Sequence, residues 1–192
     1  MPNIYIIAGC NGAGKTTASF TVLPEMLDCN EFVNADEIAK GLSPFQPETV
    51  SFHAGRIMLE RIMELVELEV DFAFETTLTT ISYKNTIELA RQRGYKITLL
   101  FFWLNDVKLA IERVATRVSE GGHNIPEDVI IRRYFKGLAY LTNIFIDICD
   151  YWIVIDNSTN PYKFIAEGTL NLPVTIYENE IWIKINTINH EK

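Results

Sequence analysis

Residues 8–17 have the sequence "AGCNGAGKTT". Within it Gly9, Gly14, Lys15 and Thr16 match the spacing G-x-x-x-x-G-K-[S/T]. Glycines adopt positive φ angles, which let consecutive backbone amides curl around an anion, and they have no Cβ to keep that anion away. The stretch therefore predicts a phosphate-binding loop of the P-loop type.

The residues on either side of the loop support this prediction. "NIYIIA", residues 3–8, is typical of a buried strand, and residues 15–27 are typical of a helix whose positive end points at the same phosphates. Lys15 is expected to reach the β- and γ-phosphates of ATP, and the Thr16 hydroxyl is expected to ligate Mg²⁺. The other predicted cofactor-binding residues are Gly9, Cys10, Asn11, Gly12, Ala13, Gly14 and Thr17. For Thr17 the competing interpretation is that it only continues the helix.

Strands and helices alternate along the rest of the chain, which favours an α/β fold with a mostly parallel sheet wrapped by helices. Further strands are predicted at residues 31–35, 71–76, 96–104 and 151–156, with helices at about 48–69, 82–93, 107–118 and 126–148. Residues 163–177 predict one more strand pair, whereas "ENEIWIKIN", residues 178–186, fits a strand or a helix. No linker divides the chain, so residues 1–192 are predicted to form one domain.

Composition narrows the classes of partner. The chain has 192 residues, is 48% hydrophobic and carries a formal net charge of −8, which argues against a nucleic-acid partner. Its three cysteines are too widely spaced for a disulfide framework or a zinc site. The chain start lacks signal-peptide features, and the longest apolar run, residues 97–104, is too short to cross a bilayer. We therefore expect a soluble cytoplasmic protein with no membrane partner.

Two acidic residues fall at the ends of predicted strands, where open α/β sheets bind their ligands. Asp36 follows "FVNA", residues 32–35, and Glu75 ends "DFAFE", residues 71–75. A kinase needs a carboxylate to accept the proton of the attacking hydroxyl, so Asp36 is the predicted catalytic base. The competing interpretations are that Asp36 caps the following helix, or that the adjacent Glu37 is the base.

Glu75 is a candidate for substrate binding. An unpaired charge at the end of a buried strand costs on the order of several kcal/mol, so a metal ion, a lysine or a substrate hydroxyl would have to offset it. The alternative is a structural hydrogen bond to Thr77 or to a neighbouring loop. The hydroxyls of Thr76 and Thr77 are expected to face the same pocket.

Four arginines flank a glycine-rich loop. Arg113 and Arg117 lie four residues apart, so they share a helix face, where like charges repel by roughly a few tenths of a kcal/mol unless an anion lies between them. Arg132 and Arg133 lie beyond the loop. We predict a lid over about residues 113–133 in which Arg117, Arg132 and Arg133 stabilise transition-state charge and Arg113 contacts the substrate. A solvated charged face is the alternative.

Several motifs together resemble the zeta toxin family of P-loop kinases, and in particular a compact zeta-toxin-like branch described as predicted ATPases. The resemblance extends in order over about residues 3–160. The motifs that carry it are "GCNGAGKTT" (9–17), "FVNADEI" (32–38), "FAFETTL" (72–78), "ERVATRV" (112–118) and "GGHNIPEDVIIRRY" (121–134). The resemblance implies a three-layer P-loop fold of the kinase type, with a mostly parallel sheet of five or more strands and a helical, arginine-bearing lid.

The resemblance also implies a reaction, the transfer of the γ-phosphate of ATP to a hydroxyl group. The implied acceptor is UDP-N-acetylglucosamine or another small hydroxyl-bearing metabolite. A base at Asp36, substrate contacts at Glu75 and Thr77, and phosphate contacts from the lid arginines follow from it. The chain departs from the toxins in the spacing between its arginine groups and in its shorter length, which leaves less material for a nucleotide-sugar pocket. No antitoxin partner can be inferred.

Two other functions are compatible with the P-loop. One is an ATP hydrolase or nucleotide-gated switch that acts on a protein partner, and the other is a nucleotide-binding module without catalysis. Against the switch, residues 96–104 do not end in an acid that would hold a metal beside the P-loop, and no "LSGGQ" signature occurs. The kinase, with ATP and Mg²⁺ as cofactors, is therefore the leading hypothesis.

Overall fold

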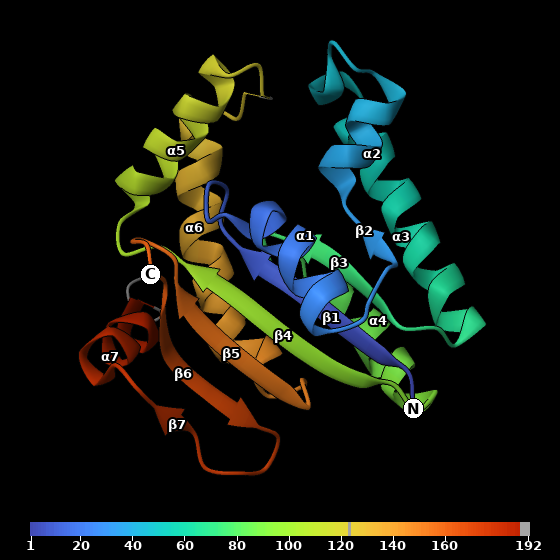
Figure 1. Cartoon of the computed structure of the whole chain (residues 1–192), viewed down its shortest axis with the longest axis vertical. Coiled ribbons are helices and arrows are strands. Elements are labelled where there is room, and N and C mark those ends of the chain that lie inside the picture. Colours follow the sequence, from blue (N-terminus) through green and yellow to red (C-terminus); the bar gives the residue numbers. More distant parts are fainter. Residues whose placement is uncertain (123, 189–192) are drawn as a thin grey trace.

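The computed structural model describes residues 1–122 and 124–188 (Figure 1). His123, which the sequence places at the tip of a glycine-rich loop, lies outside the described residues. The strands are β1 (Asn3–Gly9), β2 (Phe32–Val33), β3 (Phe72–Thr76), β4 (Lys96–Trp103), β5 (Tyr151–Asp156), β6 (Lys163–Thr169) and β7 (Thr175–Ile176). The α-helices are α1 (Lys15–Met26), α2 (Ala35–Leu42), α3 (Ser51–Leu68), α4 (Ser82–Gln92), α5 (Val107–Ser119), α6 (Glu127–Tyr140) and α7 (Asn179–Thr187).

One seven-stranded sheet organises the fold, with the strand order β2-β3-β1-β4-β5-β6-β7. The strands from β2 to β5 are parallel, and β6 and β7 add two antiparallel strands at one edge. β1 lies between β3 and β4, where Ala8 pairs with both Thr76 and Phe101. Because parallel strands share their direction, the loops after β1, β2 and β3 leave from the same edge of the sheet.

Helices cover both faces of this sheet, so the predicted α/β architecture and its mostly parallel sheet are confirmed. In Figure 1, α1 lies in front of the strands, and α4 and α6 lie behind them. The strands supply the centre of the core, where the side chains of Ile6, Phe72, Phe74 and Leu99 are at most 1% exposed. A core of this kind holds the strand ends in fixed positions, and those ends carry the candidate site.

Two helical arms rise from the edge of the sheet at which β1 and β3 end (Figure 1). One arm consists of α2, a short 3₁₀ helix (Pro47–Val50) and α3. The other consists of α5 and α6, with a π-helical turn (Leu141–Phe145) following α6. The second arm contains the predicted lid and is helical, as expected. The P-loop lies between the bases of the two arms.

Some elements differ from the sequence-based expectations. Residues 178–186, which fitted either a strand or a helix, belong to α7, where the indole of Trp182 stacks on that of Trp152 at 5.4 Å between ring centroids. Pro126 is the residue before α6 and not its first helical residue. Among the described residues, no helix is long and apolar enough to cross a membrane.

Candidate functional site

The P-loop, residues 9–16, has the conformation that its glycines predict. Gly9, Gly12 and Gly14 have φ angles of 141°, 77° and 83°, in the region that favours glycine. A Cβ on Gly9 would lie 2.2 Å from the backbone oxygen of Phe102 on the neighbouring strand. Only glycine therefore lets β1 turn into the loop beside β4, and Gly14 leads directly into the first turn of α1.

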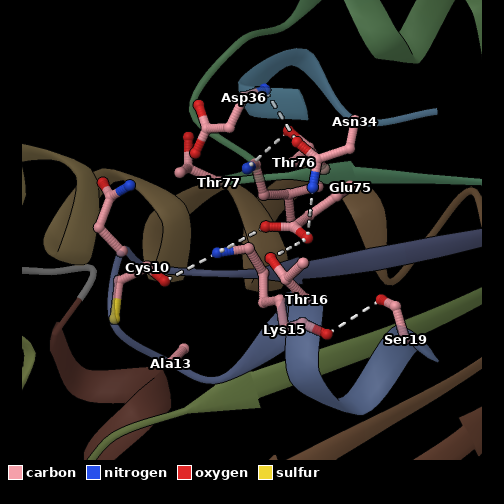
Figure 2. A network of polar contacts seen from close by, with 12 residues as sticks. Cys10, Ala13, Lys15, Thr16, Ser19, Asn34, Asp36, Glu75, Thr76 and Thr77 are labelled. Carbon is pink, nitrogen blue, oxygen red and sulfur yellow. Dashed lines mark hydrogen bonds and ion pairs between the residues drawn. The ribbon is translucent and has the colours of Figure 1, made fainter. Parts of the chain in front are cut away.

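Lys15, Thr16 and Asn34 converge on the carboxylate of Glu75 (Figure 2). Lys15 Nζ lies 3.5 Å from Glu75 Oε1 and donates to the Cys10 carbonyl oxygen at 2.9 Å. The Thr16 hydroxyl donates to Glu75 Oε2 at 2.7 Å, and Asn34 Nδ2 donates to the same oxygen at 3.0 Å. The charge at the end of β3 is thus offset by a lysine and two hydrogen bonds.

The acid beside the P-loop, Glu75, lies on a different strand from the one on which the sequence was searched for it. The carboxylate beside the P-loop threonine comes from β3 and not from β4, and both strands pair with β1. The lack of an acid at the end of residues 96–104, which weighed against the nucleotide-gated switch, therefore does not exclude a carboxylate beside the P-loop threonine. Of the structural alternatives for Glu75, a hydrogen bond to a neighbouring loop is present, because Asn34 lies between β2 and α2, whereas the Thr77 hydroxyl bonds to Thr79.

Asn34, and not Asp36, caps helix α2. The Asn34 side chain accepts hydrogen bonds from the backbone amides of Asp36 at 2.8 Å and Glu37 at 3.4 Å. The interpretation of Asp36 as the cap is therefore wrong. Asp36 lies in the first turn of α2, and Figure 2 shows its carboxylate turned toward Thr77. Glu37 instead pairs with Lys40 at 2.6 Å.

Residues 76–80, which we call the threonine turn, connect β3 to α4. The Thr76 hydroxyl accepts a hydrogen bond from the Leu78 amide at 3.0 Å, and Thr77 and Thr79 share a hydrogen bond of 3.0 Å between their hydroxyls. Leu78 has a φ of 59°, unusual for a branched residue, and its side chain is completely buried. Burial of Leu78 thus holds a strained turn that points threonine hydroxyls at the site.

Two adjoining cavities occupy the space between the arms. The outer cavity, about 460 Å³, is lined by Thr16, Ala35, Asp36, Glu37, Ala39, Lys40, Pro47, Ser51, Arg117, Glu120, Gly121, Gly122 and Arg133. The inner cavity, about 220 Å³, is lined by Asn11, Lys15, Asn34, Ala35, Asp36, Met58, Glu75, Thr76, Thr77, Thr79, Thr80, Tyr83 and Arg133. Asp36 and Arg133 line both cavities, so they lie where the two meet.

The structure separates the four candidate arginines. Arg133 lines both cavities and donates to Asn11 Oδ1 at 3.2 Å, whereas its neighbour Arg132 is exposed and lines neither. Arg117 lines the outer cavity. Burial lowers the pKa of the Arg133 guanidinium below its ordinary value, and nearby Asp36 partly opposes that shift. The helical period thus brings one of the two adjacent arginines into the cleft and leaves the other in solvent.

Arg113 lies behind the P-loop and lines neither cavity. Its guanidinium donates to the carbonyl oxygens of Gly12 at 3.4 Å and Ser158 at 3.2 Å. Asn157, from the same loop after β5, donates to the Ala13 carbonyl oxygen at 2.8 Å. These contacts brace the P-loop from its far side, a position that does not match the expected substrate contact of Arg113.

Two other residues expected at the cofactor, Cys10 and Thr17, line neither cavity. The Cys10 thiol is buried, and burial raises its pKa to about 11, against a smaller opposing effect of Lys15. Thr17 is exposed and lines neither cavity, which matches the interpretation that it only continues the helix.

Several residues of the inner cavity were missed by the sequence analysis. Thr79, Thr80 and Tyr83 follow the quoted motif "FAFETTL" (72–78), and Met58 lies in α3, which the sequence predicts as a helix without any site residue. Asn34 carried a recognisable signal, because asparagine before a helix is a favoured cap. No motif marks the others, since their role depends on how α3 and α4 meet above β3.

Comparisons with known proteins identify a matching family model and a related protein. Residues 1–160 match the family model described as Zeta toxin. An uncharacterised protein of Haemophilus influenzae is 29% identical over 127 residues, which cover 66% of this chain and 88% of that protein.

Two solved structures share the fold. The crystal structure of AvrRxo1-ORF1:-ORF2 with ATP has a TM-score of 0.75 at 16% identity, covering 96% of this chain and 63% of that one. A structure of the PezAT chromosomal toxin–antitoxin system of Streptococcus pneumoniae has a TM-score of 0.61 at 15% identity, covering 99% of this chain and 86% of that one. This chain thus spans less than two thirds of the AvrRxo1 chain, and at these identities the likeness shows the fold alone.

Proposed function

Because this chain belongs to the Zeta toxin family, we propose that it is a kinase that transfers the γ-phosphate of ATP to a hydroxyl group of a small acceptor molecule. The observation that carries the proposal is the position of Asp36 at the junction of the two cavities, beside the P-loop and its lysine. A P-loop alone serves hydrolases and switches equally well. A carboxylate that shares a cavity with Lys15 and has room beside it for an acceptor is what a kinase needs.

The donor set at Thr16 fits a magnesium ion. Mg²⁺ prefers hard oxygen ligands, takes one or two carboxylates, and fills its other positions with water and substrate phosphates. Among the described residues, no group of three or more His, Cys, Asp or Glu gathers to hold a metal, so a dedicated protein cage is absent there. Thr16 and Glu75 would hold the ion together with the nucleotide, and the ion would neutralise charge on the β- and γ-phosphates. The Thr16 hydroxyl gives its one hydrogen to Glu75, which leaves its lone pairs available.

The protein groups then divide the work of transfer. Lys15 exchanges the Cys10 carbonyl for phosphate oxygens, and the P-loop amides hold the triphosphate. The acceptor hydroxyl attacks the γ-phosphorus and gives its proton to Asp36, while the bond from phosphorus to the oxygen shared with the β-phosphate breaks and leaves ADP. Arg133 and Arg117 stabilise the charge that develops on the transferred group.

We further propose which classes of acceptor molecule and protein partner this kinase uses. Nucleotide sugars such as UDP-N-acetylglucosamine are candidates through the family, alongside other hydroxyl-bearing metabolites. Because the PezAT structure comes from a toxin–antitoxin system, an antitoxin is the class of protein partner to look for.

The test is incubation of the protein with ATP, Mg²⁺ and a panel of hydroxyl acceptors that includes nucleotide sugars, followed by mass spectrometry. A phosphorylated acceptor that disappears with Asp36→Asn is the expected result. ADP and inorganic phosphate as the only products across the panel, unchanged by Asp36→Asn, would identify the protein as an ATP hydrolase or switch instead.

A further inference from the structure

The inner cavity limits what the acceptor can be. Its volume of about 220 Å³ equals that of about seven water molecules at ~30 Å³ each. It lies below the ~300 Å³ at which pockets for drug-sized ligands begin. A single sugar ring fills this space, so the nucleotide part of a nucleotide sugar would have to extend into the outer cavity or into solvent.

The charge of the lining points to an uncharged occupant. Among the described residues that line the inner cavity, the cations are Lys15 and Arg133 and the anions are Asp36 and Glu75. Both cations already face the P-loop side, where Lys15 contacts Cys10 and Glu75 and Arg133 contacts Asn11. A γ-phosphate entering from the P-loop would use them. Asp36 lies near Arg133 at the junction with the outer cavity, so the two cations and two anions of the lining offset one another and leave no excess positive charge for an anionic acceptor.

The wall away from the P-loop is rich in hydroxyl groups. Four threonines of the threonine turn line the cavity, and each hydroxyl can donate one hydrogen bond and accept others. Thr77 and Thr79 bond to each other and keep lone pairs for a ligand. Hydroxyls of a polyol can both donate to and accept from such groups, whereas a phosphate dianion can only accept.

An apolar surface completes the wall. The Tyr83 ring lines the cavity, stacked on Phe74 with 5.1 Å between ring centroids and 25° between ring planes. Its hydroxyl points to the Met58 sulfur at 3.7 Å, and Met58 lines the same cavity. A sugar ring has hydroxyls at its rim and C–H groups on its faces, so it matches a cavity with threonines on one side and a fixed aromatic ring on another.

From this geometry we propose that the acceptor is a neutral polyol of about the size of a hexose, bound in the inner cavity with one hydroxyl at Asp36. The inference rests on the proposed kinase function and narrows its substrate class. The acceptor hydroxyl oxygen bonds to the γ-phosphorus, its proton passes to Asp36, and ADP leaves.

The experiment compares acceptors that share one sugar. The protein is incubated with ATP and Mg²⁺ and either free N-acetylglucosamine, a panel of neutral hexoses and inositols, or UDP-N-acetylglucosamine, and phosphorylated products are quantified by mass spectrometry. We expect at least one neutral polyol to be phosphorylated with a kcat/KM at least tenfold above that for UDP-N-acetylglucosamine. Preferential phosphorylation of the nucleotide sugar would overturn this inference and leave the kinase standing. ATP consumption with no phosphorylated acceptor would overturn both.

Variants of the threonine turn give a second readout. Thr77→Val removes a hydroxyl at nearly constant volume and is expected to raise the KM for the polyol about tenfold, with the KM for ATP unchanged, while Thr77→Ser restores it. Thr187→Val, on the exposed face of α7, is the control. Equal KM values for the polyol in wild type and Thr77→Val would contradict the placement of the acceptor in this cavity.

Discussion

The P-loop and the threonine turn follow neighbouring parallel strands, β1 and β3, and turn at the same edge of the sheet, yet they present opposite chemistry. The P-loop offers backbone amides, three glycines with positive φ angles and one buried lysine. The threonine turn offers side-chain hydroxyls around a leucine in a strained conformation. Amides bind phosphate whatever molecule carries it, while side-chain hydroxyls select a particular partner. The difference suggests that nucleotide binding is a fixed property of this site and that acceptor choice is the adjustable one.

Asp36 lines the inner cavity together with both of these regions, and removing its charge gives the largest expected effect. Asp36→Asn should lower acceptor phosphorylation by roughly 10²- to 10⁴-fold, because the hydroxyl loses its proton acceptor. The affinity for ATP, measured by calorimetry, should stay within about twofold, since the P-loop is untouched. Glu37→Gln is the matched control, because Glu37 is paired with Lys40. A larger loss in Glu37→Gln than in Asp36→Asn would move the base to Glu37.

A substitution in the P-loop should weaken both nucleotide binding and phosphate transfer. Lys15→Ala removes the cation that faces Glu75 and should lower phosphate transfer by roughly 10²- to 10³-fold. Unlike Asp36→Asn, it should also weaken ATP binding measurably. Lys84→Ala, which removes a half-exposed lysine paired with Glu88, should change neither. Unchanged ATP affinity in Lys15→Ala would contradict the assignment of nucleotide binding to the P-loop.

The two adjacent arginines of α6 should differ in their contribution to transfer, because Arg133 lines both cavities and Arg132 lines neither. Arg133→Ala should slow transfer roughly tenfold to a hundredfold, the loss expected for one charge-assisted hydrogen bond of ~1.5–3 kcal/mol. Arg132→Ala should cost less than about threefold, since the side chain is exposed and away from the cleft. Steady-state kcat for both variants, measured side by side, is the test. Equal losses of kcat in the two variants would contradict the assignment of Arg133 alone to the cleft.

The smallest effect should be seen in stability. Asn34→Ala removes the cap of α2 and one partner of Glu75, and should lower the free energy of unfolding by about 1–2 kcal/mol. Urea denaturation gives this value directly. Asn30→Ala, an exposed asparagine in the loop before β2, is the control. No loss of stability in Asn34→Ala would contradict the stabilising role of Asn34 as the cap of α2 and partner of Glu75.

Much of the fold was predictable because its signals are local. The glycine spacing of the P-loop, the apolar runs of β1, β3 and β4 and the helical stripe of α3 each specify an element from a few adjacent residues. The helix α7 was ambiguous, because its apolar residues pack against the distant strands β5 and β6, with Trp182 on Trp152. That contact joins residues thirty positions apart, and nothing within residues 178–186 encodes it.

The candidate site was predictable in its acids and less so in their partners. Asp36 and Glu75 followed from their places at strand ends, but the bond from Thr16 to Glu75 depends on β3 lying next to β1. That neighbourhood is a property of strand order, which residue spacing does not reveal. In the same way, whether Arg132 or Arg133 enters the cleft depends on the rotation of α6, which is fixed where Gly137 approaches the threonine turn. A Cβ on Gly137 would lie 2.7 Å from the Thr77 carbonyl oxygen.

In the proposed kinase reaction, the γ-phosphoryl group of ATP passes to an organic hydroxyl and not to water. ATP labelled with ¹⁸O on all γ-phosphate oxygens other than the one shared with the β-phosphate tests it, with mass spectrometry of the products formed in the presence of neutral polyols and nucleotide sugars. We expect an acceptor monophosphate that carries three labelled oxygens, formed in step with ADP. Recovery of all the label in inorganic phosphate that has gained one oxygen from water would contradict it.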